Sequence, residues 1–345
     1  MKIKKDELLQ VLNEVKLGVT SKSLITQMAN VMFTGSEVIT YNEQIGVCHP
    51  FKTDFVASIN HNDLLGVVNK IKEDEFEMEL VENEVQISSK KTRAGLVVSL
   101  EEKLVASLEG LLNQLPSSEN NLEWIDIPSD FMSGALLCIP SASKDMGLGV
   151  LTCLYAHDKD LICTDNKRVS WYEMDSSLNA EFFVKANILK ELAQFEFKKM
   201  SISESWINFK TGNNTVFSTR LVRGKSLGYF KKLFEGFTGT AIELPEGLKE
   251  VIDGASVMSQ DDEHRDIWIT FDADKIVCAT QSNRGWIEKE LDIEFKSEAP
   301  LQFMVSATAL QQILGMKLKT IVGDNKSYFE SGNFKHVLLH RMNND

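Results

Sequence analysis

The sequence predicts an α+β protein built from three similar domains, in each of which two helices pack on antiparallel sheet. Its 345 residues exceed the size that one hydrophobic core usually spans. One pattern of strand, cap and helix also occurs three times, at intervals of about 125 and about 121 residues, which is the size of an ordinary domain. The predicted domains therefore span residues 1–121, 122–239 and 240–345.

The repeated pattern is a β-branched residue that ends a strand, a polar residue that can cap a helix, and an amphipathic helix. Apolar residues near 3.6-residue spacing predict the helix in each copy. Side chains of asparagine and threonine can accept hydrogen bonds from the unpaired amides of a first helical turn. The copies lie at 59–64, 184–189 and 305–310, with Asn62, Asn187 and Thr308 as candidates for the cap or the first turn.

Each predicted domain begins with a strand and a first helix, and a hairpin lies between its two helices. First helices are predicted at 8–15, 131–139 and 248–258. Hairpins, in which β-branched and aromatic runs flank a polar turn, are predicted at 31–39, 152–162 and 268–277. The order expected for one domain is β-α-β-β-β-α-β-β-β-β, with linkers at 113–121 and 235–240.

Composition and charge limit the class of protein. The 50 acidic and 37 basic residues give a net charge of −13, which excludes a surface that is basic all round but allows a local basic face. No window of about 18 uncharged apolar residues occurs, and the N-terminus lacks the apolar stretch of a secretory signal. We expect a soluble, cytoplasmic protein with no membrane partner. The five cysteines form no C-x-x-C pair and predict reduced, buried thiols.

Two pairs of aspartates are the best candidates for enzyme chemistry. Asp158 with Asp160, and Asp272 with Asp274, resemble the carboxylate pairs that hold a divalent cation in some transferases. Both pairs lie at corresponding predicted turns, which favours solvated turns. The sequence also lacks a phosphate-binding loop, a complete dinucleotide fingerprint and a nucleophile elbow. We expect no enzyme, no metal and no cofactor, with a metal-dependent transferase as the alternative.

Basic residues occupy similar places in the three copies, near the ends of predicted helices. Together they predict a face where cations gather while acidic residues cover the rest of the surface. The candidates are Lys16, Lys22, Lys70, Lys72, Lys144, Lys185, Lys190, Arg265, Lys317 and Lys319.

Three segments resemble the family of the bacterial β sliding clamp, the processivity subunit of the replicative DNA polymerase, or a phage relative. Residues 161–169 are similar to that family's strand and Thr-Asp-Gly-His-Arg-Leu motif. Residues 221–229 resemble its Leu-Val-Asp-Gly-Arg-Phe-Pro-Asp-Tyr motif, and residues 336–342 resemble its C-terminal strand. The resemblance covers nearly the whole chain, motif by motif, and departs from the family where Asn166-Lys167 replace Gly-His.

The resemblance implies a homodimeric ring in which two protomers meet head to tail around duplex DNA. It also implies that the basic residues named above face the DNA and contact its phosphates without reading the base sequence. Such a ring is a docking platform for a replicative polymerase and its clamp loader. It further implies a cleft for partner peptides that involves Thr164, Arg168, Val169, Leu227, Val337 and Leu339. The implied protomer interface joins Ala94, Leu96 and Val98 to Val257 and Met258. A monomeric DNA-binding accessory protein that does not encircle DNA is a further alternative.

Overall fold

The computed structural model describes residues 1–20, 26–98, 122–227, 230–259, 265–294 and 300–342. Contacts divide the chain into two compact units, each discontinuous in sequence. Unit 1 comprises Met1–Ile127 and Lys190–Leu221, and unit 2 comprises Pro128–Leu189 and Val222–Asp345. The boundary falls inside the predicted middle domain, because strands that follow residue 190 pair with a strand near the N-terminus.

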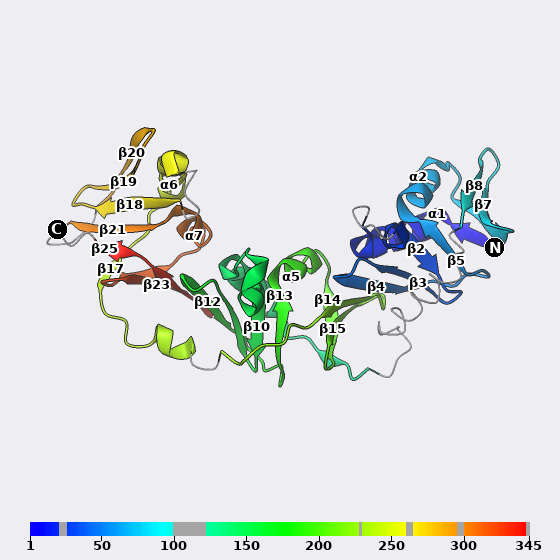
Figure 1. Cartoon of the computed structure of the whole chain (residues 1–345), viewed down its shortest axis with the longest axis horizontal. Coiled ribbons are helices and arrows are strands. Elements are labelled where there is room, and N and C mark those ends of the chain that lie inside the picture. The colour runs from blue at the N-terminus through cyan, green and yellow to red at the C-terminus, as the bar shows by residue number, and fades with distance from the viewer. Residues whose placement is uncertain (21–25, 99–121, 228–229, 260–264, 295–299, 343–345) are drawn as a thin grey trace. The chain divides into compact units, whose positions relative to one another are not determined.

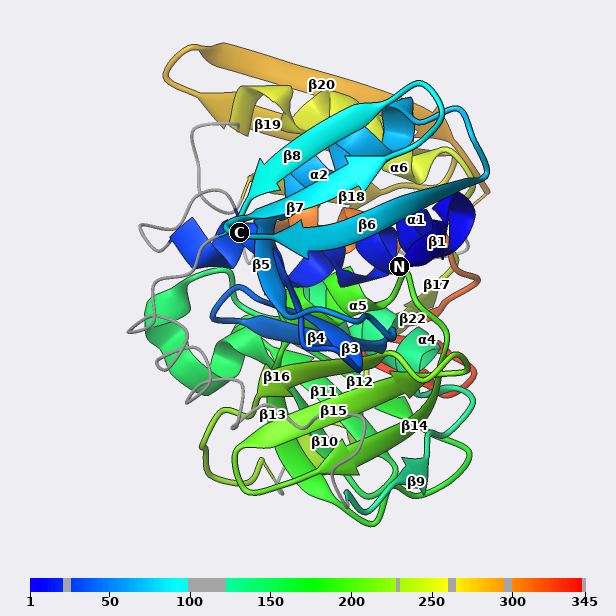
Figure 2. The ribbon, with the colours of Figure 1, turned by 90° about the vertical axis from the view of Figure 1, so that its right-hand side faces the viewer.

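Unit 1 contains two antiparallel sheets and two α-helices in its described residues, apart from the end of α5 (Ala186–Leu192), which crosses the unit boundary. Its elements are β1 (Lys2–Lys4), α1 (Lys5–Val15), η1 (Lys16–Gly18), η2 (Thr26–Ala29), β2 (Asn30–Phe33), β3 (Glu37–Tyr41), β4 (Ile45–Pro50), β5 (Ala57–Asn60), α2 (His61–Lys70), β6 (Glu75–Val81), β7 (Glu84–Ser88), β8 (Arg93–Val97), β9 (Ile125–Asp126), β14 (Phe197–Ile202), β15 (Trp206–Thr211) and β16 (Val216–Arg220). The sheets have the orders β1-β6-β7-β8 and β5-β2-β3-β4-β16-β15-β14-β9 (Figures 1 and 2). Helices α1 and α2 contact each other, and α1 lies on β3 and β4.

Unit 2 repeats this plan with an eight-stranded and a five-stranded sheet. Its elements are α4 (Phe131–Cys138), η3 (Ile139–Ser141), η4 (Met146–Thr152), β10 (Cys153–His157), β11 (Asp160–Thr164), β12 (Arg168–Glu173), β13 (Glu181–Lys185), η5 (Phe230–Phe234), β17 (Thr240–Ile242), α6 (Leu248–Ala255), η6 (Ser256–Ser259), β18 (Asp266–Phe271), β19 (Lys275–Ser282), β20 (Gly285–Asp292), β21 (Leu301–Ser306), α7 (Ala307–Gln311), β22 (Lys319–Val322), β23 (Lys326–Ser331), β24 (Phe334–Leu339) and β25 (Arg341–Met342). The sheets have the orders β13-β10-β11-β12-β24-β23-β22-β17 and β20-β19-β18-β21-β25 (Figure 1). Helix α4 lies on β11 and β12, and α6 contacts α7.

The order of elements repeats along the chain, from β1 to β8, from β9 to β16 and from β17 to β24. In the described residues each copy reads strand, helix, four strands, helix, three strands. The α+β class and the triplication are confirmed. The predicted order, with three strands between the helices and four after them, was wrong. Strands β5, β13 and β21 run directly into α2, α5 and α7, as the repeated pattern predicts. The additional strands before the second helix are β4, β12 and β20, each of which pairs with the second strand of its hairpin.

Asn62, Asn187 and Thr308 lie in the first turns of α2, α5 and α7, which was one of the two predicted places, and the side-chain caps that the structure identifies lie two residues earlier. Asn60 Oδ1 accepts from the amides of Asn62 and Asp63, at 3.0 and 3.2 Å. Ser306 Oγ accepts from the amide of Ala309 at 3.3 Å, so Thr308 lies inside α7. Asn187 likewise lies inside α5. The buried His61 explains the early start of α2, because its Nε2 lies 2.9 Å from the carbonyl oxygen of Leu12 and ties the first turn to α1.

The interior agrees with the expectation for the thiols. Cys48, Cys138, Cys153, Cys163 and Cys278 are all free and buried. Burial raises the pKa of Cys278 to about 12 and places the pKa of Cys163 well above its usual value, so these thiols are poor nucleophiles. Among the helices of the described residues, none combines the length and the apolar character needed to cross a bilayer.

Candidate functional site

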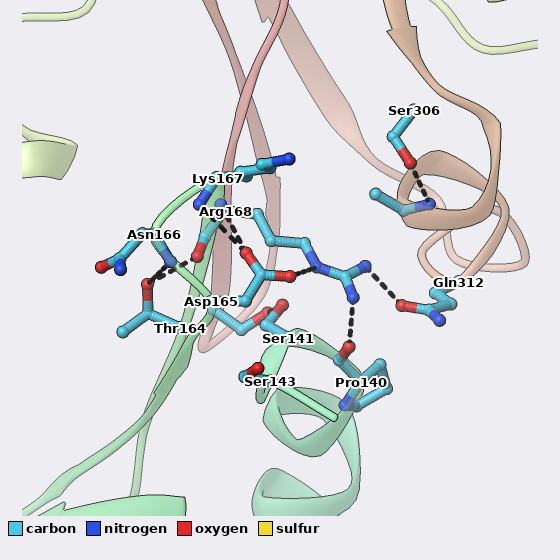
Figure 3. Close-up of polar contacts among 12 residues, drawn as sticks. Pro140, Ser141, Ser143, Thr164, Asp165, Asn166, Lys167, Arg168, Ser306 and Gln312 are labelled. Atoms are coloured by element: carbon cyan, nitrogen blue, oxygen red, sulfur yellow. Dashed lines mark hydrogen bonds and ion pairs between the residues drawn. The ribbon is translucent and has the colours of Figure 1, made fainter. Parts of the chain in front are cut away.

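A turn between β11 and β12 positions Arg168 in unit 2. Asp165 Oδ1 accepts from the amides of Lys167 and Arg168, at 3.0 and 3.1 Å. The Thr164 hydroxyl donates to the carbonyl of Arg168 at 2.7 Å and accepts from the amide of Asn166 at 3.2 Å. Asn166 has φ 71°, a left-handed conformation that asparagine tolerates. The Thr-Asp-x-x-Arg spacing is thus a turn in which two side chains satisfy backbone groups (Figure 3).

The guanidinium of Arg168 joins three elements of unit 2 (Figure 3). Its Nε donates to Asp165 Oδ2 at 3.0 Å in an ion pair. Its Nη2 donates to the carbonyl of Pro140 in η3 at 2.6 Å, and its Nη1 donates to Oε1 of Gln312, just after α7, at 2.5 Å. Charge-assisted bonds of this kind are among the stronger ones in proteins. Since only 9% of the side chain is exposed, this cation holds β12, η3 and α7 together.

A groove of about 700 Å³ lies beside Arg168. Its walls come from the connection between η3 and η4, from β21 and α7, and from the end of β24. Leu148 and Leu339 on these walls are 44% and 49% exposed. A concave surface that combines exposed leucines with charges of both signs suits a short peptide. The charged lining residues are Lys144, Asp145, Asp165, Lys167, Arg168, Asp266 and Arg341.

The residues predicted for the partner-peptide cleft lie on both faces of the eight-stranded sheet. Arg168 and Leu339 line the groove, and Thr164 lies in the turn beside it. Val169 and Val337 are paired across β12 and β24 and belong to a separate apolar cluster, against which Leu227 packs. Because neighbours along a strand point to opposite faces, Arg168 and Val169 face different surroundings.

A buried polar network lies behind Arg168, between β12 and β24. His336 Nδ1 lies 2.8 Å from Ser170 Oγ, which lies 2.7 Å from Ser141 Oγ. Burial and the charge of Arg168 lower the pKa of His336 to about 3, so its imidazole is neutral near pH 7. In the part of the chain that the structure describes, the buried Nε2 of His336 has no hydrogen-bond partner.

A second network supports the pairing of β4 with β16 in unit 1. His49 Nδ1 lies 3.1 Å from Glu14 Oε2 and 2.8 Å from Thr215 Oγ1. Asn213 Nδ2 donates to the other oxygen of Glu14 at 2.7 Å. Burial lowers the pKa of His49, and the charge of Glu14 offsets only part of this shift. These contacts join α1, β4 and the turn before β16.

Strands β8 and β20 each have an open edge in the described residues, since β8 pairs with β7 and β20 with β19. Val97 on β8 and Trp286 on β20 are both 72% exposed. Of the residues predicted for the protomer interface, Ala94 and Leu96 lie half-buried on β8, and Val98 follows it and is buried. Val257 and Met258 lie on η6, which contacts β20. Strand β20 itself was not predicted from the sequence, although its Trp286, a residue type favoured in strands, could have indicated it.

The predicted DNA-facing cations lie at the surface near the ends of helices and strands. Lys16 follows α1, Lys70 ends α2 and Lys190 lies in the last turn of α5. Lys185 is half-buried at the end of β13. Lys22 lies outside the described residues. The remaining exposed candidates are Lys72, Lys144, Arg265, Lys317 and Lys319.

The four aspartates of the enzyme hypothesis lie in unlike surroundings. Asp158 is exposed in the turn between β10 and β11, and Asp272 and Asp274 lie in the turn between β18 and β19. Asp160 is only 5% exposed, so the prediction of a solvated turn was wrong for this residue. It begins β11, where Trp171 Nε1 donates to its carboxylate at 2.9 Å. The described residues contain no group of three or more side chains placed to hold a metal ion.

Comparison with known proteins identifies the fold. No family model and no curated protein matches the sequence. The beta subunit from DNA polymerase of Streptococcus pyogenes is similar with a TM-score of 0.81 and 16% identity over 99% of both chains. The DNA polymerase sliding clamp of Pseudomonas aeruginosa is similar with a TM-score of 0.80 and 14% identity over 99% of both chains. That of Bacillus subtilis has a TM-score of 0.78 and 17% identity, over 99% of this chain and 98% of the other. The chain has the sliding clamp fold along nearly its whole length.

Proposed function

We propose that this chain is a DNA sliding clamp, a non-enzymatic processivity factor that encircles duplex DNA and tethers a replicative polymerase. Two copies pair head to tail, each with three domains at 1–121, 122–239 and 240–345. One observation carries the proposal: β4 pairs with β16 and β12 pairs with β24, so the same junction between repeats is made twice within the chain. Strands β20 and β8 hold the corresponding places in their repeats and have open edges in the described residues.

Pairing of β8 with β20 of a second copy would remove both open edges. Exposed strand edges otherwise invite uncontrolled association. A head-to-tail interface closes into a ring when the rotation between copies permits. Such a ring holds the polymerase by enclosing DNA, so each contact from the predicted cations to phosphate can be weak, unspecific and sensitive to salt.

The internal junction in unit 2 predicts which residue of β20 lies at the junction between copies. Asp160 begins β11 and pairs with Glu173, and Lys275 begins β19 and pairs with Asp292. Arg168 lies five residues before Glu173, and Ile287 lies five residues before Asp292. Ile287 therefore corresponds to Arg168, which pairs with Leu338.

The partner on β8 follows from the same comparison. Leu338 pairs with Ser327, and both are buried; Ser327 lies one residue after Lys326, which closes the two-residue turn before β23. Leu96 pairs with the buried Val85, which lies one residue after Glu84, the residue that closes the turn between β6 and β7. Because paired residues of an antiparallel sheet lie on the same face, Leu96 of one copy should face Ile287 of the other.

Cysteine crosslinking tests this register. Leu96→Cys combined with Ile287→Cys should give a covalent species of two chains with a short bismaleimide, and the native thiols are buried and will not compete. The matched control is Leu96→Cys with Asp292→Cys, which shifts one thiol by about 17 Å along the strand and should crosslink poorly. A protein that sediments as one chain at micromolar concentration would count against the ring.

Retention on DNA separates the ring from a monomeric accessory protein. The crosslinkable variant is incubated with circular or linear duplex, crosslinked and washed with concentrated salt, which removes electrostatic contacts. A closed ring should stay on circles and leave linear molecules through their ends. Loss from both forms would favour the accessory protein.

We also propose that the groove beside Arg168 receives a short peptide from the polymerase or the clamp loader. Its support is the exposure of Leu148 and Leu339 on concave walls. Leu148→Asp should weaken capture of the replicative polymerase at least tenfold. Leu136→Asp is the matched control, since Leu136 is 41% exposed on α4 and does not line the groove. Equal binding by both variants would contradict the assignment.

A further inference from the structure

A small cavity lies inside unit 2, among strands of both its sheets. Its volume is about 10 Å³, close to the smallest space that holds one water molecule. The walls come from β17, β22 and β23 of the eight-stranded sheet, from β18 and β21 of the five-stranded sheet, and from α6 and α7. The lining side chains are apolar except for those of Thr320 and Ser327, so these two hydroxyls are the polar side-chain groups that a molecule in the cavity would meet.

The hydroxyl of Thr320 lacks a partner. Thr320 lies on β22 and is only 1% exposed. Within the described residues, no group forms a hydrogen bond with its Oγ1, which is itself buried. A hydroxyl shielded from bulk solvent is nearly always bonded, either to the protein or to an ordered water molecule. Since Thr320 lines the cavity, the cavity is the place where its missing partner fits.

The hydroxyl of Ser327 has acceptor capacity left, as its contact with His340 shows. His340 Nε2 lies 2.8 Å from the carbonyl oxygen of Gly323, which can only accept, so this nitrogen carries a proton. Burial lowers the pKa of His340, so the ring is neutral near pH 7 and its Nδ1 is an acceptor. Ser327 Oγ lies 2.9 Å from that Nδ1 and therefore donates its proton to it. A further partner of Ser327 Oγ must consequently be a donor.

The strand register separates the two hydroxyls by the span of a bridging molecule. Thr320 pairs with Phe329, and Val322 pairs with Ser327, so Thr320 and Ser327 are diagonal neighbours on β22 and β23. Diagonal neighbours on one face of a sheet are about 7 Å apart, which is too far for a direct bond between two hydroxyls. One small molecule between them can bond to both.

We infer that the cavity binds one ordered water molecule, which accepts a hydrogen bond from Thr320 Oγ1 and donates one to Ser327 Oγ. Water suits both hydroxyls because it donates and accepts, and the volume leaves no room for a larger ligand. The bridge fastens β22 to β23 inside the core and holds Ser327 against His340, which lines the groove on its other side. The inference is independent of the proposed function, since it concerns the interior of a single chain.

Thr320→Val in the full-length chain tests the inference, because valine keeps the shape of threonine and removes its hydroxyl. A bridging water would lose one of its two partners, so hydrogen exchange of the β22 amides should become about fivefold faster. Thr280→Val is the matched control, since Thr280 Oγ1 is also buried without a partner in the described residues and Thr280 does not line the cavity. Removing such a hydroxyl should leave exchange of the β19 amides unchanged or slower. The same response to Thr320→Val would overturn the inference.

A second measurement does not depend on the stability of a variant. A crystal structure of the unaltered chain, at a resolution that shows ordered water, should contain one density peak within hydrogen-bonding distance of both Thr320 Oγ1 and Ser327 Oγ. An empty cavity, or a peak that contacts neither hydroxyl, would also overturn the inference. Neither experiment contains DNA or a polymerase, so failure here leaves the ring to be judged by the crosslinking of Leu96→Cys with Ile287→Cys.

Discussion

The junctions between repeats, β4 with β16 in unit 1 and β12 with β24 in unit 2, share antiparallel pairing but differ in their supporting side chains. In unit 1, His49 contacts the carboxylate of Glu14. In unit 2, His336 contacts a serine hydroxyl and lies within the field of Arg168. A carboxylate favours the imidazolium form and a guanidinium disfavours it. The same backbone pairing therefore occurs with a histidine beside a negative charge in unit 1 and beside a positive charge in unit 2. The two junctions should respond differently to substitution and to acid.

The largest effect is expected from Arg168→Ala, which removes the cation that joins β12, η3 and α7. Loss of these charge-assisted bonds should lower the unfolding free energy of the β12–β24 junction by about 2–4 kcal/mol. Hydrogen exchange of β24 amides measures this, with β16 amides as the internal reference. Arg168→Lys is the control, because lysine keeps the charge but cannot make the forked contacts. A decrease of less than about 0.5 kcal/mol in this unfolding free energy would show that Arg168 does not stabilise the junction.

Acid should separate the two junctions next. The pKa of His336 falls from 6.5 to about 3 on folding, so below pH 6.5 the unfolded chain binds a proton that the folded chain excludes. Stability is therefore lost as the pH falls, by about 2 kcal/mol at pH 5. Exchange of β24 amides between pH 7.5 and 5, corrected for intrinsic rates, should show this loss. His336→Leu should flatten the dependence, since Ser170 keeps its contact with Ser141. An equal slope in both proteins would contradict the assignment.

Glu14→Gln should have a smaller effect and make the junctions more alike. It keeps a hydrogen-bonding side chain beside Thr215 and Asn213 but removes the charge that offsets the lowered pKa of His49. The expected loss at the β4–β16 junction is about 1 kcal/mol near pH 7, growing as the pH falls below 6.5. Hydrogen exchange of the β16 amides measures this loss of stability. Asp6→Asn, on the same helix and exposed, is the matched control, and an equal loss from both changes would contradict the prediction.

The smallest effect is expected away from both junctions, for Asp272→Ala/Asp274→Ala in the β18–β19 turn. These side chains lie at the surface, so the unfolding free energy should change by no more than about 0.5 kcal/mol. Polymerase processivity with this variant should match that of the unaltered chain. Abolished activity would revive the metal-dependent transferase.

Periodic features of the fold could be predicted from the sequence. Helix α1 buries Leu8, Val11, Leu12 and Val15 at the spacing that indicated it. Hairpins were found because polar turns separate β-branched runs. The segment that holds Arg168 was identified by its resemblance to a family motif, and the structure shows why the motif keeps its spacing, since Thr164 and Asp165 bond backbone groups of the turn.

Features that depend on contacts distant in sequence were not predictable in the same way. Asp160 looks like a turn residue, but it is buried because Trp171 and Lys231 come to it from other segments. Val169 and Arg168 lie on opposite faces of the sheet, and which face each one occupies can be assigned only when the strand register is known. The open edge of β20 appears only once every neighbour in the sheet is known.

The proposed pairing of β8 with β20 between copies has a consequence for assembly size. A copy that joins through one of them still presents the other, so growth ends only when the last copy meets the first. Closure depends on the rotation that relates one copy to the next. A substitution that changed this rotation but left strand pairing intact would yield open filaments instead of closed rings. Their length would rise with protein concentration, which distinguishes such a variant from one that has simply lost its ability to associate.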